Sequence, residues 1–178
     1  FAGGSTAKND TSLTTATGKL ITGFETLRVS ATSSGGTVGT TDIVTFDPTL
    51  VAGITSYEVG TSTYGVALKN LVANAAVKVV GNVSAAGGLT LLQKDATGTA
   101  DAATLTFDNG NTLTTGNNNG LAVATLTVGN GTDSIETLNV VSKGLITGSG
   151  TANTITTLAT ATGTAPSKVV ITGDQAFT

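Results

Sequence analysis

The residues best suited to bind a ligand or carry out chemistry are aspartates in turns rich in glycine and asparagine. Asp133 closes a Gly-Asn-Gly-Thr-Asp turn that contains Gly129 and Gly131, and Asp108 with Asn109 follows an apolar run. Carboxylate, amide and backbone carbonyl oxygens are the ligands that Ca²⁺ takes in proteins. We therefore expect calcium at these two turns. The alternatives are a glycine-rich corner in which Asp133 caps the next strand, and a plain Asp-Asn-Gly turn.

Five further carboxylates lie at the edges of expected turns, namely Asp42, Asp47, Asp95, Asp101 and Asp174. Calcium takes six to eight oxygen ligands, and each of these positions supplies only one carboxylate. Each of these residues would therefore join an ion site only if folding brings two turns together, and each is otherwise a solvated loop residue.

Three glutamates, Glu25, Glu58 and Glu136, raise the question of acid–base catalysis by paired carboxylates. Each is expected to follow or precede a buried apolar residue in an alternating strand, which places it on the solvent side. The chain also contains no histidine and no cysteine. Ser-His and Cys-His nucleophiles and nitrogen- or sulfur-rich metal sites are thereby excluded, so we expect no enzymatic activity.

Composition narrows the class of partner. The 178 residues carry 11% charged side chains and a net charge of −3, with eight Lys and Arg residues scattered along the chain. Without a basic patch, nucleic acid is not an expected partner. No apolar run approaches the roughly 20 residues of a membrane span. Small residues dominate, which predicts a thin interior filled by valine and alanine.

Short runs rich in Val, Thr, Ile and Leu, separated by Gly and Asn signals, predict strands rather than long helices. The expected strands are 24–30, 42–46, 55–59, 65–68, 76–80, 88–92, 103–107, 121–128, 135–141, 154–159 and 168–172. Brief helical turns are expected within 47–52 and 68–74. Thr-x-Thr pieces such as 104–106 and 125–127 suggest ice binding, but their irregular spacing favours threonine stacked on the face of a sheet.

Three stretches follow one pattern: 23–29 (GFETLRV), 53–59 (GITSYEV) and 134–140 (SIETLNV). In each, a large apolar residue is followed by a second one three positions later and by valine two positions after that. The glycines that open the first two copies are 53 − 23 = 30 positions apart. Recurrence of a short strand-like unit predicts a solenoid, in which each repeat buries its apolar side against the next.

These observations predict an all-β fold, specifically a parallel β-solenoid, over residues 20–178. Residues 1–19 are expected to be a loose lead-in or the end of a preceding segment, and both ends are interpreted as cut from a longer chain. An antiparallel β-sandwich is the alternative fold. The sandwich is disfavoured because aromatic residues make up only 4% of the chain.

The units 24–29 (FETLRV) and 135–140 (IETLNV) resemble elements of bacterial surface-layer proteins of the type I secreted, RTX-related kind, such as those of Caulobacter and Campylobacter. That resemblance implies a right-handed β-solenoid that binds calcium along its turns and assembles into a lattice. The family's calcium repeat is Gly-Gly-x-Gly-x-Asp-x-apolar. Residues 128–135 match it at two glycines, the Asp and the apolar position, but lack the first Gly.

The resemblance further implies an extracellular location on the bacterial cell surface. The partners would be other copies of the chain through lateral lattice contacts, and the outer cell surface through other parts of the parent protein. A repeat module of a large type I secreted RTX adhesin is the alternative function. A polysaccharide-active β-helix enzyme would need a carboxylate or basic cluster along one face, which the sequence does not indicate.

Overall fold

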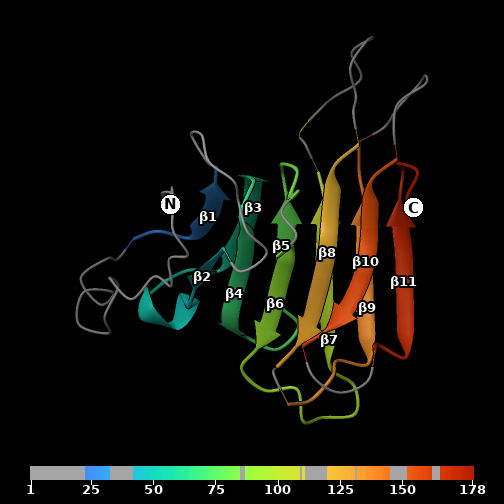
Figure 1. The fold of residues 1–178 in the computed structure, drawn as a ribbon. Helices are drawn as coiled ribbons and strands as arrows, with labels where there is room; N and C mark the ends of the chain where they lie inside the picture. Colours follow the sequence, from blue (N-terminus) through green and yellow to red (C-terminus); the bar gives the residue numbers. More distant parts are fainter. Residues whose placement is uncertain are drawn as a thin grey trace.

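The computed structural model describes residues 23–32, 42–84, 87–108, 110, 120–130, 132–144, 152–161 and 165–178. In these ranges eleven strands and one 3-10 helix follow one another (Figure 1). They are β1 (Thr26–Ala31), β2 (Ile43–Phe46), η1 (Pro48–Leu50), β3 (Ser56–Ser62), β4 (Gly65–Leu71), β5 (Ala76–Val79), β6 (Leu89–Gln93), β7 (Ala102–Phe107), β8 (Ala122–Gly129), β9 (Thr137–Ser142), β10 (Thr154–Thr160) and β11 (Lys168–Gly173). The expected lead-in, residues 1–19, lies outside the described residues.

Successive strands alternate between two sheets. One sheet has the order β1-β3-β5-β7-β9-β11 and the other the order β10-β8-β6-β4-β2. Every strand pairing described within these sheets is parallel. Each pair of consecutive strands therefore forms one layer, which we call a rung, and Figure 1 shows the rungs following the sequence from blue to red.

The all-β prediction is confirmed, and the antiparallel sandwich is wrong. Every expected strand is present, with bounds that differ by at most three residues at either end. The sandwich fails because its sheets would need hairpins between neighbouring strands, whereas neighbours in each sheet here come from successive rungs.

The repeat of 30 residues corresponds to the pairing of β1 with β3. Leu27 lies opposite Tyr57 and Val29 opposite Val59, and both pairs are separated by 57 − 27 = 59 − 29 = 30 positions. The first two copies of the pattern are thus stacked in register. This match follows from geometry, because parallel neighbours one rung apart place equivalent residues side by side.

The third copy enters the same sheet but is displaced by two residues. Followed from strand to strand, the position of Leu27 leads to Val140 and not to Leu138, through the row Leu27, Tyr57, Val77, Leu105 and Val140. A shift of two residues keeps every side chain on the same face of a strand. The apolar face is therefore preserved although the register of the motif is not.

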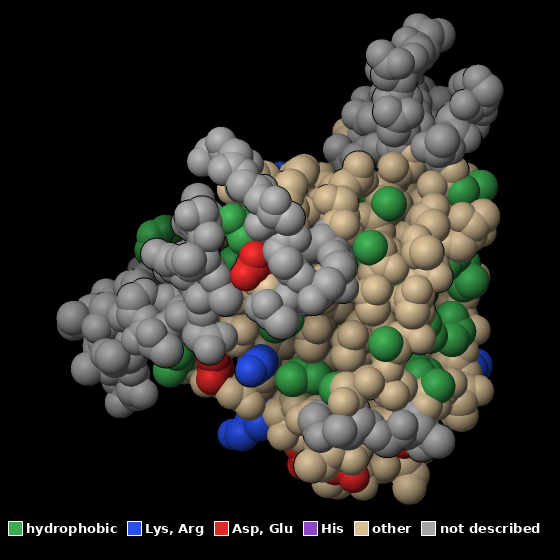
Figure 2. Space-filling model, viewed as in Figure 1, with side chains coloured by type: hydrophobic (Ala, Val, Ile, Leu, Met, Phe, Trp, Pro, Cys, Tyr) green, Lys and Arg blue, Asp and Glu red, His purple; other side chains and the backbone are tan. Residues whose placement is uncertain are grey.

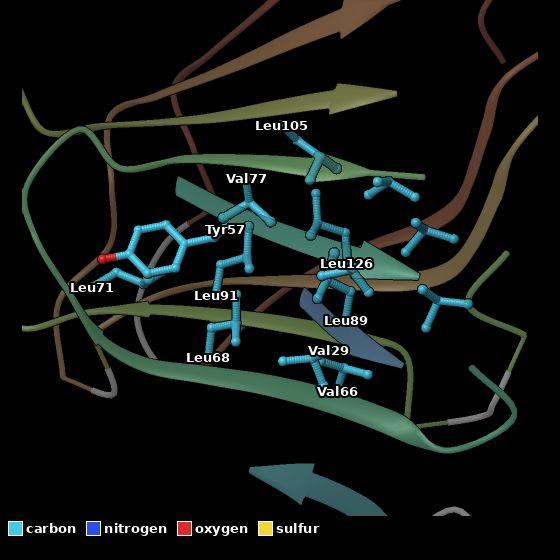
Figure 3. Packing of buried hydrophobic residues seen from close by; sticks show 14 of the residues in the cluster. Val29, Tyr57, Val66, Leu68, Leu71, Val77, Leu89, Leu91, Leu105 and Leu126 are labelled. Atoms are coloured by element: carbon cyan, nitrogen blue, oxygen red, sulfur yellow. The ribbon is translucent and has the colours of Figure 1, made fainter. Parts of the chain in front are cut away.

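The interior lies between the two sheets and is filled chiefly by leucine and valine (Figure 3). The largest fully buried side chains include Phe107, Leu68, Leu89, Leu105 and Leu126. The expectation of a valine-rich interior is confirmed, but leucine contributes nearly as many buried side chains as valine, and alanine contributes few. Side chains of this size are long enough to fill the space between facing sheets, which pack about 10 Å apart.

Threonine occupies the outer faces, as the Thr-x-Thr pieces predicted. In β7 the buried Leu105 separates the half-exposed Thr104 and Thr106, and Thr90 lies opposite Thr127 in the other sheet. These rows are ordinary alternation of apolar residues facing inward and polar residues facing outward.

One of the two expected helical turns is confirmed and the other is wrong. Asp47 accepts hydrogen bonds from the N–H (2.9 Å) and hydroxyl (2.6 Å) of Thr49 and so caps η1. The run 68–74 is instead the end of β4 followed by a turn. Its Leu68 and Leu71 both face inward because the strand is irregular between them, where Asn70 has φ 56°. An extra residue in a strand imitates the three-residue spacing of a helix.

Candidate functional site

The turn that contains Asp133 connects β8 to β9 and is held mainly by its own side chains. Asn130 Oδ1 accepts from the N–H groups of Thr132 (2.8 Å) and Asp133 (2.5 Å). Asp133 Oδ2 accepts from the hydroxyl of Thr132 (2.9 Å) and the amide of Asn130 (3.2 Å). Among the described residues, the carboxylate therefore accepts hydrogen bonds from its own turn, and none is seen to the start of β9.

Gly129 leaves β8 with φ 138°, a conformation that side chains rarely adopt. A Cβ on this residue would lie 3.0 Å from the backbone oxygen of Asp133. The turn thus closes tightly over Gly129, as the sequence pattern implied. Gly131 lies outside the described residues.

A second turn, between β6 and β7, lies beside the first. Together they line a polar hollow of about 200 Å³, bordered by Ala96, Thr97, Gly98, Thr132, Asp133, Ser134 and Glu136. Figure 2 shows acidic side chains at the lower edge of the molecule, where Figure 1 places these connections. The condition set by the sequence, that folding must bring two turns together, is met for this pair.

Glu136 joins these two turns. Its Oε2 accepts from the N–H of Asp101 at 2.7 Å, and its own N–H donates to the carbonyl of Asp101 at 3.0 Å. Its carbonyl in turn accepts from Lys168 N–H at 3.0 Å. Glu136 was expected to be a simple solvent-side residue. It is instead half-buried and hydrogen-bonded to the preceding rung, a role that depends on contacts between turns 35 residues apart.

The two aspartates of the second turn, Asp95 and Asp101, differ in how their carboxylate oxygens are hydrogen-bonded. Asp95 Oδ1 accepts from the N–H (3.0 Å) and hydroxyl (2.7 Å) of Thr97, and these two bonds lower the pKa of Asp95. Asp101 Oδ2 is buried without a hydrogen-bond partner. It lies so close to Gly98 that a Cβ there would approach it to 2.7 Å. One carboxylate oxygen thus remains available in this turn as an acceptor.

Asp108 and Asp133 lie at opposite ends of the strands of one sheet. Asp108 follows the last residue of β7, whereas Asp133 precedes the first residue of β9, and β7 and β9 are parallel neighbours. The two predicted calcium turns are therefore separated by the length of the strands and cannot share an ion. Asn109 lies outside the described residues.

The surroundings of Asp108 are those of an ion pair. Its Oδ2 lies 3.2 Å from Lys78 Nζ, and its Oδ1 accepts from the N–H of Gly110 at 2.9 Å. Burial by itself raises the pKa of this carboxyl. The Gly110 N–H, the Lys78 ammonium and the charge of Lys143 outweigh that effect, so the pKa lies below its usual value.

The remaining carboxylates have separate roles. Asp47 Oδ2 accepts from Asn70 Nδ2 at 2.6 Å, and Asp174 Oδ1 accepts from Gly144 N–H at 3.2 Å. Glu58 lies between Arg28 and Lys78 in the pairing register, on the outer face of its sheet. Within the described ranges, no three carboxylates come close enough together to hold a metal ion.

Sequence reasoning identified Asp133 and the turn-edge residues Asp95 and Asp101, but it missed the hollow itself and the part played by Thr97, Gly98 and Glu136. The available signal was the similar position of two Asp-containing turns before strands β7 and β9. Comparison with protein-family models, curated proteins and solved structures finds no match to this chain. In the described part of the chain, no helix has the length and apolar character needed to cross a membrane.

Proposed function

We propose that this chain is a right-handed β-solenoid segment of a bacterial surface-layer protein, with a structural and not a catalytic role. The observation that carries the proposal is the alternation of successive strands between two parallel sheets. A chain that returns to the same sheet at every second strand lengthens by adding rungs, and each rung contacts only its neighbours. Such a stack serves as a stiff building element.

Surface chemistry supports an extracellular structural role. The charged fraction is only 11%, and the outer faces of the strands present threonine and asparagine, as in Thr104, Thr106 and Asn139. Neutral faces of this kind allow close lateral packing because no large like-charge repulsion opposes it. Lateral contacts between copies would then build a lattice on the cell surface, and the outer cell surface would be reached through other parts of the parent protein.

We place the proposed calcium at the hollow between the two stacked turns. Asp133 and Glu136 line it and supply carboxylate oxygens. These are hard oxygen donors of the type that Ca²⁺ takes, with backbone carbonyls and water completing the six to eight ligands. Asp108, already paired with Lys78, is a poorer donor.

Calcium titration followed by thermal unfolding tests this placement. A ligand that binds only the folded state raises the melting temperature by mass action. We expect millimolar Ca²⁺ to raise it for the unaltered chain, Asp133→Asn to remove the rise, and Asp108→Asn to retain it. An identical melting temperature in calcium and in EGTA would rule out a calcium role for this segment.

The alternative is a repeat module of a large type I secreted RTX adhesin, which would share the fold and the calcium turns. Electron microscopy of the purified chain with calcium distinguishes the two. A surface-layer segment should form ordered two-dimensional arrays, whereas an adhesin module should remain as single rods.

A further inference from the structure

The six-stranded sheet carries an ordered set of charges on its outer face. Each strand contributes one residue to the set, either within the strand or directly after it, and none of the six is buried. The sign of the charge alternates from strand to strand in the order β1-β3-β5-β7-β9-β11. We call this set the charge ladder, and its members are Arg28, Glu58, Lys78, Asp108, Lys143 and Asp174.

The first three charges share one row of the sheet. Arg28 lies opposite Glu58, and Glu58 lies opposite Lys78. Lys78 is in turn opposite Thr106 of β7, and Asp108 lies on the same face two residues further along that strand. Because Lys78 Nζ lies 3.2 Å from Asp108 Oδ2, the ladder passes from this row to the next without a break.

The last three charges share the second row. Phe107 lies opposite Ser142 in the pairing of β7 with β9, so the residues that follow them, Asp108 and Lys143, are neighbours. The N–H of Lys143 accordingly donates to the carbonyl of Phe107 at 2.9 Å. Asp174 follows the partner of Ser142 in β11, and its N–H donates to the carbonyl of Ser142 at 3.0 Å. Asp174 is therefore beside Lys143.

The rest of this face consists mainly of small, uncharged residues, such as Thr104 and Asn139. Within the strands as described, the only other charge on it is that of Lys168, the first residue of β11. Six strands about 4.8 Å apart and about 20 Å long present roughly 550 Å². Two such faces in contact would bury about 1,100 Å², which is just above the area that a specific interface needs.

An alternating row with an even number of charges is complementary to its own reverse. If the strands of the sheet are counted from 1 to 6, a second copy whose stack runs in the opposite direction places strand k against strand 7 − k. One of these numbers is odd and the other even, so every contact joins opposite charges. Stacks that run in the same direction, or a slip by one strand, place like charges opposite one another, which opposes association.

We propose that two copies of this chain pack face to face through the outer faces of their six-stranded sheets, with their stacks running in opposite directions. The charged pairs between the copies are Arg28 with Asp174, Glu58 with Lys143, and Lys78 with Asp108, and each pair occurs twice. The members of a pair lie in rows two residues, or about 7 Å, apart along the strands, which long side chains can bridge. Both copies use the same surface, as in other two-fold interfaces.

This contact would be one of the lateral contacts that the proposed function requires. It is inferred, however, from the order of charges across the face of the sheet. It uses neither the ends of the stack nor a calcium ion, so it can be tested separately from both.

Sedimentation velocity of the whole chain in EGTA and about 50 mM salt tests the proposal, at concentrations from about 10 to 500 µM because the small area predicts a weak interface. We expect a species of twice 17.4 kDa. About 0.5 M salt should weaken it, since exposed charges are screened. Lys69→Glu is the matched control, because Lys69 is exposed in β4 of the other sheet, and it should leave dimerisation unchanged.

Charge reversal at the two ends of the ladder tests the orientation. Arg28 and Asp174 are five strand spacings apart in one chain, about 24 Å, which exceeds the screening length of roughly 14 Å at this salt concentration. Arg28→Glu and Asp174→Lys should each weaken dimerisation by about tenfold, because like charges then face each other at two places. An equimolar mixture of the two variants should recover affinity to within about threefold, since the reversed charge of one then faces the reversed charge of the other.

Glu58→Lys and Lys143→Glu form a second pair with the same expectation, and circular dichroism checks that all four variants are folded. Monomer at all concentrations, a dimer that the single reversals leave unchanged, or mixtures that remain as weak as their components would overturn the proposal. Because every measurement is made in EGTA, failure here leaves the calcium hollow untouched, and failure of the calcium titration leaves this contact untouched.

Discussion

Asn153 connects three separate parts of the chain inside the fold. Its Oδ1 accepts from Leu121 N–H at 2.7 Å, and its Nδ2 donates to Ser142 Oγ (2.9 Å) and to the carbonyl of Lys143 (3.1 Å). The side chain is 1% exposed, so water cannot replace these bonds. A polar residue in this position is stabilising only because each of its groups has a partner.

Replacing this residue should therefore be costly. We expect Asn153→Ala to lower the free energy of unfolding by about 2–3 kcal/mol, because it leaves buried partners unsatisfied. Asn82→Ala is the matched control. Asn82 Oδ1 accepts from the N–H of Ala122, which follows Leu121, the residue bonded by Asn153. This bond is exposed, so its loss should cost less than about 1 kcal/mol. Urea denaturation of both variants measures the difference, and equal losses would contradict the argument.

Asp108 makes stability depend on acid pH. Its pKa is held below the usual 3.8, so its contribution is complete above the unfolded value and is lost as the pH falls through the folded pKa. We expect Asp108→Asn to be less stable than the unaltered chain near neutral pH, by less than about 1 kcal/mol because the pair is partly exposed. The two stability curves should converge below pH 3.8. Curves that stay parallel down to acid pH would show that the ion pair does not act in this way.

At the scale of the strands, glycine sets how closely one rung approaches the next. Gly88 has φ +59°, and a Cβ on it would lie 2.1 Å from the backbone oxygen of Thr125. Gly110 has a similar φ of +73°, but a Cβ there would meet nothing within 4 Å. A substitution at Gly110 therefore introduces backbone strain alone, whereas a substitution at Gly88 introduces both backbone strain and a clash between rungs.

Alanine substitution at both glycines tests this distinction. We expect Gly110→Ala to cost about 1 kcal/mol, the penalty for a left-handed conformation. Gly88→Ala should cost about 2–3 kcal/mol more, because the approaching backbone must move. Chemical denaturation gives both values, and a similar cost at the two positions would mean that the rungs adjust without strain.

The strands could be predicted from the sequence because alternation is a local signal. The register of β1 and β3 was also available, since the pattern repeats in phase at Leu27 and Tyr57. The displacement of Leu138 was not, because a shift of two residues leaves the apolar pattern unchanged. The end of β4 was misinterpreted for a related reason, since its bulge imitates helical spacing. The hollow beside Asp133 depends on which turns become neighbours, which no single turn reveals.

For the whole molecule, the layered arrangement predicts a gradient of stability. A central strand such as β7 has neighbours on both sides, whereas β11 pairs only with β9 among the described strands. We expect amide hydrogen exchange to be slowest in β7 and fastest in β11, because local opening begins where contacts are fewest. Uniform exchange across the strands would indicate a single cooperative unit.

The alternation of strands between two sheets also separates the paired strands from the connections that join them. Each connection joins one sheet to the other, although Val83, in the connection between β5 and β6, also pairs with Ser62 and Val123. Connections accordingly differ in length, from 65 − 62 − 1 = 2 residues between β3 and β4 to 122 − 107 − 1 = 14 between β7 and β8. Foreign peptides inserted at such joints would be carried at regular intervals along one rim, so the molecule is a natural starting point for displaying epitopes.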